Sequence, residues 1–378
     1  MPSVSPSYQV RAVRCDYRAD DEAVYQALCR ATEPLSRVWQ RLGLARRVAL
    51  KFNQDKAPQR QGRVAGQLQQ LVSEKVARAV LRLLRERLRA ELVCVDVSYY
   101  AMYEGTRFED TETLLPLLRE FGVEFVDGTQ PPYRRCPVPG GGRMFASYLL
   151  PEAAVAADET ISVAKLKNHA FMGITLSLKN LFGLMPGEPH GHGRHYYHHL
   201  VRMPYMLADL GRVFDPALCI VDGLVGQAGQ EWGDGGEHGP PRIADVLLAG
   251  DHPVATDACG ARLMGHDPGR DWLAPPFHRD RNALLVAAEG GYGTVDPAAI
   301  DFANEAEAPG DPVAFRAARE VRRSRLKPVV SDERAHDETL RSSENDLCLL
   351  RFLDVDLPSV AGGIIQRPLR DAPVDADQ

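Results

Sequence analysis

The sequence predicts an α/β fold with a mostly parallel, doubly wound sheet and helices on both faces of that sheet. Short β-branched and apolar runs alternate with longer amphipathic stretches along most of the chain, which is typical of βαβ units. The 378 residues, 44% of them hydrophobic, are enough to bury one large core or two medium ones. Ligands of such sheets bind outside the carboxyl ends of the strands, so we expect the functional site at that edge.

The first half of the chain contains four predicted strands separated by three predicted helices. The strands are short and rich in valine, whereas the helices repeat apolar residues at helical spacing. In order, the elements are a strand at 8–15, a helix near 20–42, a strand at 48–52, a helix near 66–90, a strand at 92–98, a helix near 110–120 and a strand at 123–127.

The alternation resumes after a loop at 131–144 that is rich in glycine, proline and arginine. The elements predicted there are a strand at 160–167, a helix near 198–212, strands at 218–223 and 245–250, and helices near 253–265 and 280–290. Because matching elements lie on both sides of the loop, we expect a single α/β domain over residues 1–300, with two lobes divided at the loop as the alternative. Residues 301–378 are expected to form a partly irregular C-terminal extension with one strand at 346–356.

Charge and hydropathy limit the expected partners. The formal charge is -6 and the pI is about 6.0, and arginines alternate with glutamates along the predicted helices, so nucleic acid is not expected to bind. The N-terminus lacks an apolar core of signal-peptide length, and no segment reaches the roughly 18 apolar residues of a membrane span. We therefore expect a cytoplasmic protein without a membrane partner, and a homo-oligomer is left open.

The seven cysteines predict neither a metal–thiolate site nor a disulfide framework. They are at least fourteen residues apart, so no CxxC motif exists and no iron–sulfur cluster is expected. Cys94 and Cys219 lie within apolar runs, where a cysteine is usually a small buried hydrophobic residue.

Lysine is rare in this chain and unevenly distributed. There are seven lysines against thirty-eight arginines, and three of the seven, Lys165, Lys167 and Lys179, lie within fifteen residues. Lys51 and Lys56 form a second group. An ammonium is a compact charge that binds a phosphate or carboxylate oxygen, a task for which the planar guanidinium is less suited. The lysine-bearing segments therefore predict an anion-binding site.

Charged or polar side chains occur at or just after six predicted strands. They are Lys51 with Asn53, Asp96, Asp127, Lys165 with Lys167, Asp222, and Asp251. Because parallel strands bring their carboxyl ends to one edge, we expect these side chains to gather there. Aspartates at strand ends are also common as turn formers or helix N-caps, which is the alternative for each of them.

One strand is expected to present two lysines on the same face. Lys165 and Lys167 alternate in an extended segment, so their side chains point to one side. Two ammonium groups repel each other unless an anion or carboxylates lie between them. His169 follows closely and is a candidate for the same site, with a buried structural histidine as the alternative.

The continuation of this segment adds further candidates. Lys179 and Asn180 precede an apolar turn, as expected for a helix that ends at the site, and Thr175 offers a hydroxyl group. We expect Lys51 and Asn53 to complete the substrate pocket.

Five of the eleven histidines lie at positions 190 to 199. Imidazole suits zinc, iron, nickel and manganese, so a divalent metal is one hypothesis, with His195, His198, His199 and Asp251 as ligands. No fixed-geometry metal motif is present, and a solvated histidine-rich loop is the alternative. At the start of the following helix, His198 or His199 would also suit a general acid or base.

Aspartates near a glycine-rich loop could take part in the same site. Asp222 precedes the loop, and Asp257 lies one turn into a helix whose first turn contains Pro253. Together with Asp251 they could counter the lysines or hold a divalent cation by oxygen ligands. The loop does not have the glycine spacing of a dinucleotide-binding motif.

These segments together resemble the family catalogued as domain of unknown function 362. The resemblance covers roughly residues 45 to 295 and rests on LKFNQDK, VAKLKNHAFMGITLSLKNLFGLMPG, CIVDGLVGQ, LLAGDHPVATDACGARLMGHDP and AAEGGYG. The chain departs from the family at Phe52, where a proline is usual, and at Asn168, where a threonine is usual. Many relatives carry ferredoxin-like cysteine motifs, which are missing here, so their iron–sulfur cluster is not carried over.

The leading hypothesis is an enzyme that acts on a small anionic or carbonyl-containing substrate. Lys165, Lys167 and Lys179 would hold the anion or stabilise an oxyanion, while a histidine from the 190–199 run, or His169, moves the proton. Isomerase, cyclase or lyase chemistry fits this arrangement, and a setting in specialised metabolism is left open. The alternatives are a metal-dependent hydrolase or oxygenase built on the histidine run, and a non-catalytic protein that binds an anion or a cofactor.

Overall fold

The described part of the chain is organised around a mostly parallel sheet. The structure is a computed structural model, and it describes residues 8–57, 61–64, 66–99, 107–186, 197, 201–229 and 239–306. Nine strands from these ranges form the sheet in the order β13-β1-β12-β11-β9-β2-β5-β6, with β10 paired to β9. Their bounds are β1 Tyr8–Arg14, β2 Arg47–Phe52, β5 Glu91–Asp96, β6 Glu124–Asp127, β9 Glu159–His169, β10 Gly173–Thr175, β11 Leu218–Gln227, β12 Pro241–Gly250 and β13 Ile300–Asn304. The predicted fold class is confirmed.

Strand direction decides which residues share an edge of the sheet. β11, β9, β2, β5 and β6 run parallel to one another, so their carboxyl ends meet. β12 runs antiparallel to β11, with Gly250 opposite Cys219 near the start of β11. Asp251 therefore lies at the amino edge, and our expectation that it joins the other strand ends is wrong. The apolar pattern of DVLLAG predicts a strand but not its direction.

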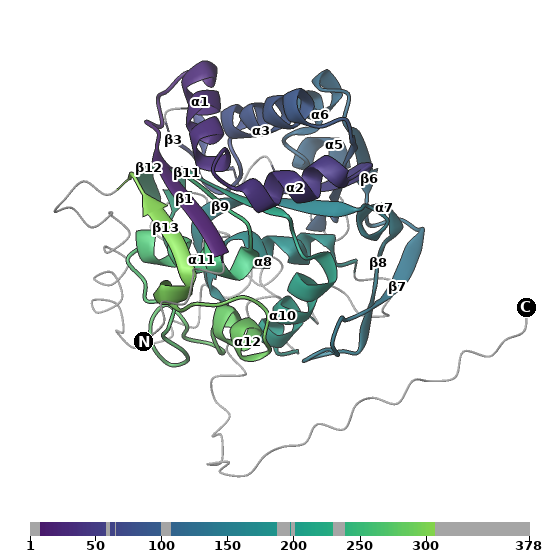
Figure 1. Cartoon of the computed structure of the whole chain (residues 1–378), viewed down its shortest axis with the longest axis vertical. Coiled ribbons are helices and arrows are strands. Elements are labelled where there is room, and N and C mark those ends of the chain that lie inside the picture. Colours follow the sequence, from purple (N-terminus) through teal and green to yellow (C-terminus); the bar gives the residue numbers. More distant parts are fainter. Residues whose placement is uncertain are drawn as a thin grey trace, which may run out of the picture. The chain divides into compact units, whose positions relative to one another are not determined.

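Helices cover both faces of the sheet (Figure 1). On one face lie α1 Asp21–Thr32, α2 Ser36–Leu44, α3 Glu74–Arg87, α5 Phe108–Thr111 and α6 Leu115–Glu120. On the other lie α7 Glu152–Val155, α8 Ser177–Asn180, the 3₁₀ helix η2 Leu181–Leu184, α10 Met203–Phe214, α11 Pro253–Leu263 and α12 Ala283–Glu289.

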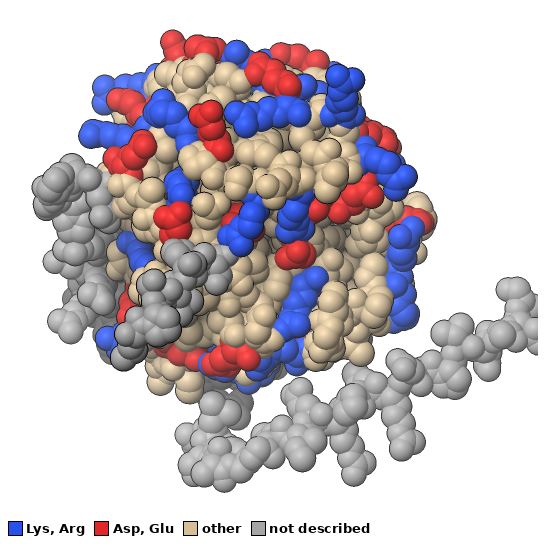
Figure 2. All heavy atoms as spheres, in the orientation of Figure 1, with Lys and Arg blue, Asp and Glu red and all other residues tan. Residues whose placement is uncertain are grey.

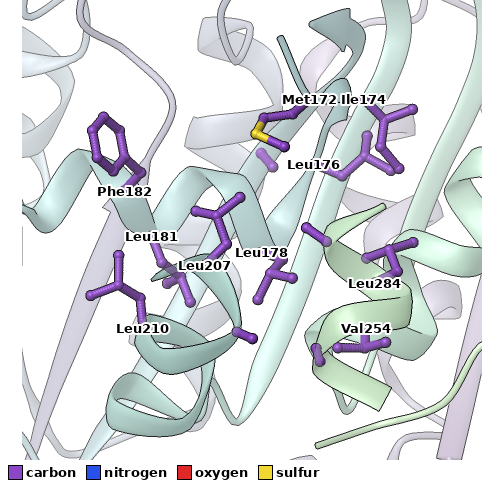
Figure 3. Close-up of a cluster of buried hydrophobic side chains, with 14 of the residues drawn as sticks. Met172, Ile174, Leu176, Leu178, Leu181, Phe182, Leu207, Leu210, Val254 and Leu284 are labelled. Carbon is purple, nitrogen blue, oxygen red and sulfur yellow. The ribbon is translucent and has the colours of Figure 1, made fainter. Parts of the chain in front are cut away.

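The central strand β9 contributes to two hydrophobic cores, one on each face. Ile161 and Val163 pack with α1, α3 and α6, whereas Ala164 and Leu166 pack with α8, α10 and α11. Figure 3 shows part of the second core, where side chains from η2, α10, α11 and α12 surround Leu178 of α8. Odd-numbered residues of β9 thus face α3, and even-numbered residues face α8.

Two predicted helices are shorter than expected. The helix near 20–42 is divided into α1 and α2, because Pro34 lacks an N–H group and disfavours helical backbone at the residue before it. The helix near 66–90 begins only at Glu74, where Ser73 caps it by accepting a hydrogen bond from Val76 N. The residues before it contain the small hairpin β3 Arg63–Val64 and β4 Gln67–Leu68.

The loop predicted at 131–144 lies largely within a hairpin outside the main sheet. Its strands are β7 Tyr133–Pro137 and β8 Ser147–Pro151. Strands from before and after this hairpin join the same sheet, and every described residue belongs to the compact unit Met1–Arg322. The strand expected at 346–356 lies outside the described residues. A last short 3₁₀ helix, η4 Pro297–Ala299, leads into β13.

Charged side chains of both signs are interspersed on the face shown in Figure 2. On the helical layer, Arg78 forms an ion pair with Glu120, and Arg82 forms one with Glu22. No described helix is both long and apolar enough to cross a membrane.

His252 caps α11 at the amino edge of the sheet. Its Nδ1 accepts a hydrogen bond from Val254 N at 3.2 Å, and its ring lies between Tyr8 and Tyr292, with ring centroids 4.7 and 4.5 Å away. Burial, followed by Arg41 and Arg37, lowers the pKa of His252 from 6.5 to about 3. The capping role requires the neutral ring, because a protonated Nδ1 cannot accept a hydrogen bond.

We expect His252 to make the protein acid-sensitive. Because the pKa of His252 is lower in the folded state than in the unfolded state, its contribution to stability is fully present above the unfolded value of 6.5. As the pH falls from 6.5 towards 3, this contribution is lost, and the folding equilibrium constant decreases by up to about tenfold per pH unit. His252→Asn retains a capping side chain but does not titrate. Urea unfolding at pH 7 and pH 5 should show a smaller loss for this variant than for the wild type; equal losses would contradict the assignment.

Candidate functional site

The parallel strands bring polar side chains of several strand ends to one edge of the sheet. The residues placed there are Lys51 and Asn53 from β2 and its end, Asp96 from β5, Asp127 from β6, Lys165, Lys167 and His169 from β9, and Asp222 from β11. Alternation along the strands separates these residues into groups on the α3 side and on the α8 side of the sheet.

Lys165 and Asp222 form a fully buried ion pair on the α3 side. Lys165 Nζ lies 2.9 Å from Asp222 Oδ2, and both side chains are 0% exposed. The carboxylate also accepts hydrogen bonds from Ser73 N at 2.8 Å and Leu224 N at 3.1 Å. Burial lowers the pKa of Lys165, and Asp222 acts in the opposite direction. The pair thus joins β9, β11 and the start of α3.

Lys167 lies one step further towards the strand end, on the same face as Lys165. Its Nζ donates to Asn53 Oδ1 at 3.1 Å and to Gln70 O at 2.7 Å, two oxygens without formal charge. Thr175 of β10 and Gln227 of β11 pair directly with Lys167 on either side. These neighbours share the face of Lys167 because cross-strand partners point the same way.

His169 ends β9 on the face of Lys165 and Lys167. Its Nδ1 accepts hydrogen bonds from Phe171 N at 3.1 Å and from Met172 N at 3.3 Å. Protonating Nδ1 would set its N–H against two amide donors, so this geometry favours the neutral ring with its hydrogen on Nε2. His169 is therefore suited to donating a hydrogen bond rather than to the proton shuttling that we expected from the sequence.

Lys51 lies on the α8 side and is paired with Asp96. Its Nζ is 2.7 Å from Asp96 Oδ2 and also contacts Phe52 O, and both side chains are buried. Gly183 of η2 packs against this ammonium: a Cβ at Gly183 would overlap Lys51 Cε and lie 2.7 Å from Nζ. Asn180 donates to Lys51 O at 2.9 Å. The KNLFG segment, residues 179–183, thus packs against the end of β2 and is hydrogen-bonded to it.

Lys179 and Asp257 do not join the two lysines of β9. Both lie on the α8 side of the sheet, where Lys179 Nζ is 4.5 Å from the centre of the Phe182 ring. Asp257 accepts hydrogen bonds from Ser177 N and Leu178 N, both at 2.8 Å, and caps α8. Burial raises its pKa to about 7, and the two amides act to lower it. The expected cluster of three lysines is thus divided by the sheet.

The candidate metal ligands that the structure describes do not form a metal site. Asp251 pairs with Arg37 at 2.5 Å at the amino edge of the sheet. His195, His198 and His199 lie outside the described residues. Within the described ranges, no three histidine, cysteine, aspartate or glutamate side chains are grouped so that they could hold a metal.

Three glutamines at this edge were not predicted from the sequence. Gln70 supplies a carbonyl to Lys167, and Gln69 Nε2 donates to Gln227 Oε1 at 2.9 Å and to Gly239 O at 2.8 Å. The run of glutamines around the β3–β4 hairpin was the available signal, but neutral amides are common in surface turns.

Removing Lys165 should strongly destabilise the protein. Lys165→Met leaves the buried carboxylate of Asp222 without its countercharge, and we expect a loss of about 3–5 kcal/mol in the free energy of unfolding. Adding Asp222→Asn should restore part of this loss because the uncompensated charge is removed. Urea unfolding measures both effects, with Lys179→Met as the control on the opposite face. A double variant no more stable than Lys165→Met contradicts this account.

Comparison with known proteins places the chain in a family but does not identify its reaction. The thylakoid-associated protein sll1697 of Synechocystis sp. is 29% identical over 159 residues, which cover 41% of this chain and 46% of that protein. The lactate racemase apoprotein of Thermoanaerobacterium thermosaccharolyticum has a TM-score of 0.38 and 13% identity, with coverage of 70% of this chain and 58% of the racemase. The chain thus spans less than two thirds of either protein. The family described as Domain of unknown function (DUF362) matches residues 48–262, more than half of the chain, and the chain belongs to this family.

Proposed function

We propose that the chain is an enzyme that acts on a small anionic, carbonyl-containing substrate at the carboxyl edge of β9. Lys167 would bind the anionic group, and Nε2–H of His169 would donate a hydrogen bond to the carbonyl oxygen. The observation that carries this proposal is that Lys167 and His169 are successive same-face residues at the strand end, with Lys165 already neutralised by Asp222 behind them.

The spacing of the two groups suits a small bifunctional molecule. Residues two apart in a strand are separated by about 7 Å along the chain, so the two side chains can contact different groups of one small molecule. Asn53 and Thr175 supply neutral polar groups next to Lys167. These support binding of the anion without competing with it by charge.

The chemistry follows from the hydrogen-bonding state of His169. A neutral imidazole N–H aimed at a carbonyl stabilises the negative charge that develops on oxygen when a neighbouring carbon loses a proton. This supports isomerase, cyclase or lyase chemistry, each of which can pass through such an oxyanion. For the proton transfer itself, His198 or His199 remains a proposal from the sequence.

We expect Lys167 to determine anion affinity. Loss of one charge-assisted hydrogen bond in Lys167→Met should weaken binding by at least about tenfold, since such bonds contribute about 1.5–3 kcal/mol. Isothermal titration calorimetry with a panel of small carboxylates, 2-oxo acids and phosphate esters would measure this. Lys179→Met, on the other face of the sheet, should bind as the wild type does. Equal affinities for wild type and Lys167→Met would overturn the site.

His169 should affect turnover more than binding. For a ligand found in that panel, exchange of the hydrogen next to its carbonyl in D₂O, followed by NMR, should slow by about 10²–10³-fold in His169→Phe because one oxyanion donor is lost. The dissociation constant should change little. Binding without any exchange or product in the wild type would reject catalysis and leave the non-catalytic binding protein.

A further inference from the structure

Glu112 is a buried glutamate whose carboxyl group has no hydrogen-bond partner. It lies between α5 and α6, is 1% exposed, and neither Oε1 nor Oε2 is bonded. Gln54 Oε1, in a side chain that is 0% exposed, is also unpartnered. An ionised carboxylate without donors is strongly disfavoured in such an environment, and the group takes up a proton instead.

The charged groups that face Glu112 favour the same outcome. The groups whose charges act on the Glu112 carboxyl are Asp96 of β5, Asp55 after β2, Lys51 of β2 and Asp127 of β6. The buried thiol of Cys94 is acted on by Asp96, Lys51 and Glu112 in turn. Lys51 has the only positive charge in this set and is already paired with Asp96 at 2.7 Å. Burial first, and then Asp96 and Asp55, raise the pKa of Glu112 well above its ordinary value, while Lys51 opposes this only in part.

Glu112 also lies where two chain segments are joined. Asp55 and Glu112 form an isolated antiparallel bridge. Lys56 N donates to Thr111 O at 3.1 Å, and Thr113 Oγ1 donates to Gln54 O at 3.2 Å. These contacts attach the residues that follow Asn53 to the segment between α5 and α6. A charge at Glu112 would therefore act on the loop that continues from the end of β2.

We propose that Glu112 is a proton-binding site: the folded protein keeps it as a neutral carboxylic acid at neutral pH, and its ionisation at higher pH loosens the junction between residues 53–56 and 111–113. The ligand of this site is the proton itself. The proposal is independent of the reaction proposed for Lys167 and His169, because it concerns the stability of the fold.

The sign of the expected effect follows from linkage. A folded-state pKa above the unfolded value means that the folded state holds the extra proton. Stability from this group is fully present below 4.5, the ordinary pKa of a glutamate, and is lost as the pH rises towards the raised folded value. Within this window the folding equilibrium constant should fall by up to about tenfold per pH unit in the wild type.

Urea unfolding from pH 5 to pH 9 tests the proposal with a matched pair of variants. Glu112→Gln keeps the shape of the neutral acid and should lack this part of the pH dependence, so it gains stability relative to the wild type as the pH rises. Glu109→Gln, an exposed glutamate on α5, removes the same formal charge and should retain the wild-type slope. In the wild type, exchange of the Lys56 amide should accelerate with pH more than in Glu112→Gln.

Two results would overturn the proposal. Identical pH slopes for the wild type and Glu112→Gln would show that Glu112 binds no extra proton. The second result would be that added magnesium or potassium chloride changes the stability of the wild type but not that of Glu112→Gln. This would show that a cation, rather than a proton, occupies the unpartnered oxygens. If Glu112→Gln does not fold, NMR of the wild type with ¹³C-labelled glutamate carboxyls tests the proposal instead. One carboxyl signal should keep the chemical shift of the protonated acid at pH 7, and the absence of such a signal would reject the proposal.

Discussion

The buried pair of Lys165 and Asp222 is the constraint on which the carboxyl edge depends. Neither charge is solvated, so the pair is tolerated only because the carboxylate also accepts hydrogen bonds from Ser73 N and Leu224 N. These bonds join β9 to β11 and hold the first turn of α3 against the sheet. Because this register is fixed, Lys167 and His169 lie one after the other on the same face at the end of β9.

A second pair performs a comparable role on the opposite face. Lys51 and Asp96 join the ends of β2 and β5, and the absence of a side chain at Gly183 leaves room for the ammonium. Asn180 then ties α8 to the backbone of β2. The long lysine-containing segment that resembles the family is thus structural over its second half, from α8 to η2, and its first half, in β9, supplies the proposed binding groups.

Sequence patterns predicted the fold and the edge that carries the candidate site, because alternating strands and helices, and lysines at strand ends, leave direct traces. They could not place Lys179, since a short hairpin after β9 carries the chain to the other side of the sheet. Asp251 was misplaced because strand direction leaves no trace in an apolar run. Glu112, in the polar stretch FEDTET, has the pattern of a solvated turn, and only burial distinguishes it.

Among the described residues near this edge, His169 and Glu112 favour a neutral form for different reasons. At His169 two backbone amides donate to Nδ1, and this geometry favours the neutral ring. Glu112 is kept neutral by burial beside Asp96 and Asp55, with no donor to stabilise its charge. A hydrogen-bonded neutral donor is preorganised and can meet an oxyanion without first losing solvent. An unpartnered acid has no such bonds to lose, so pH rather than a substrate is the signal to which it can respond.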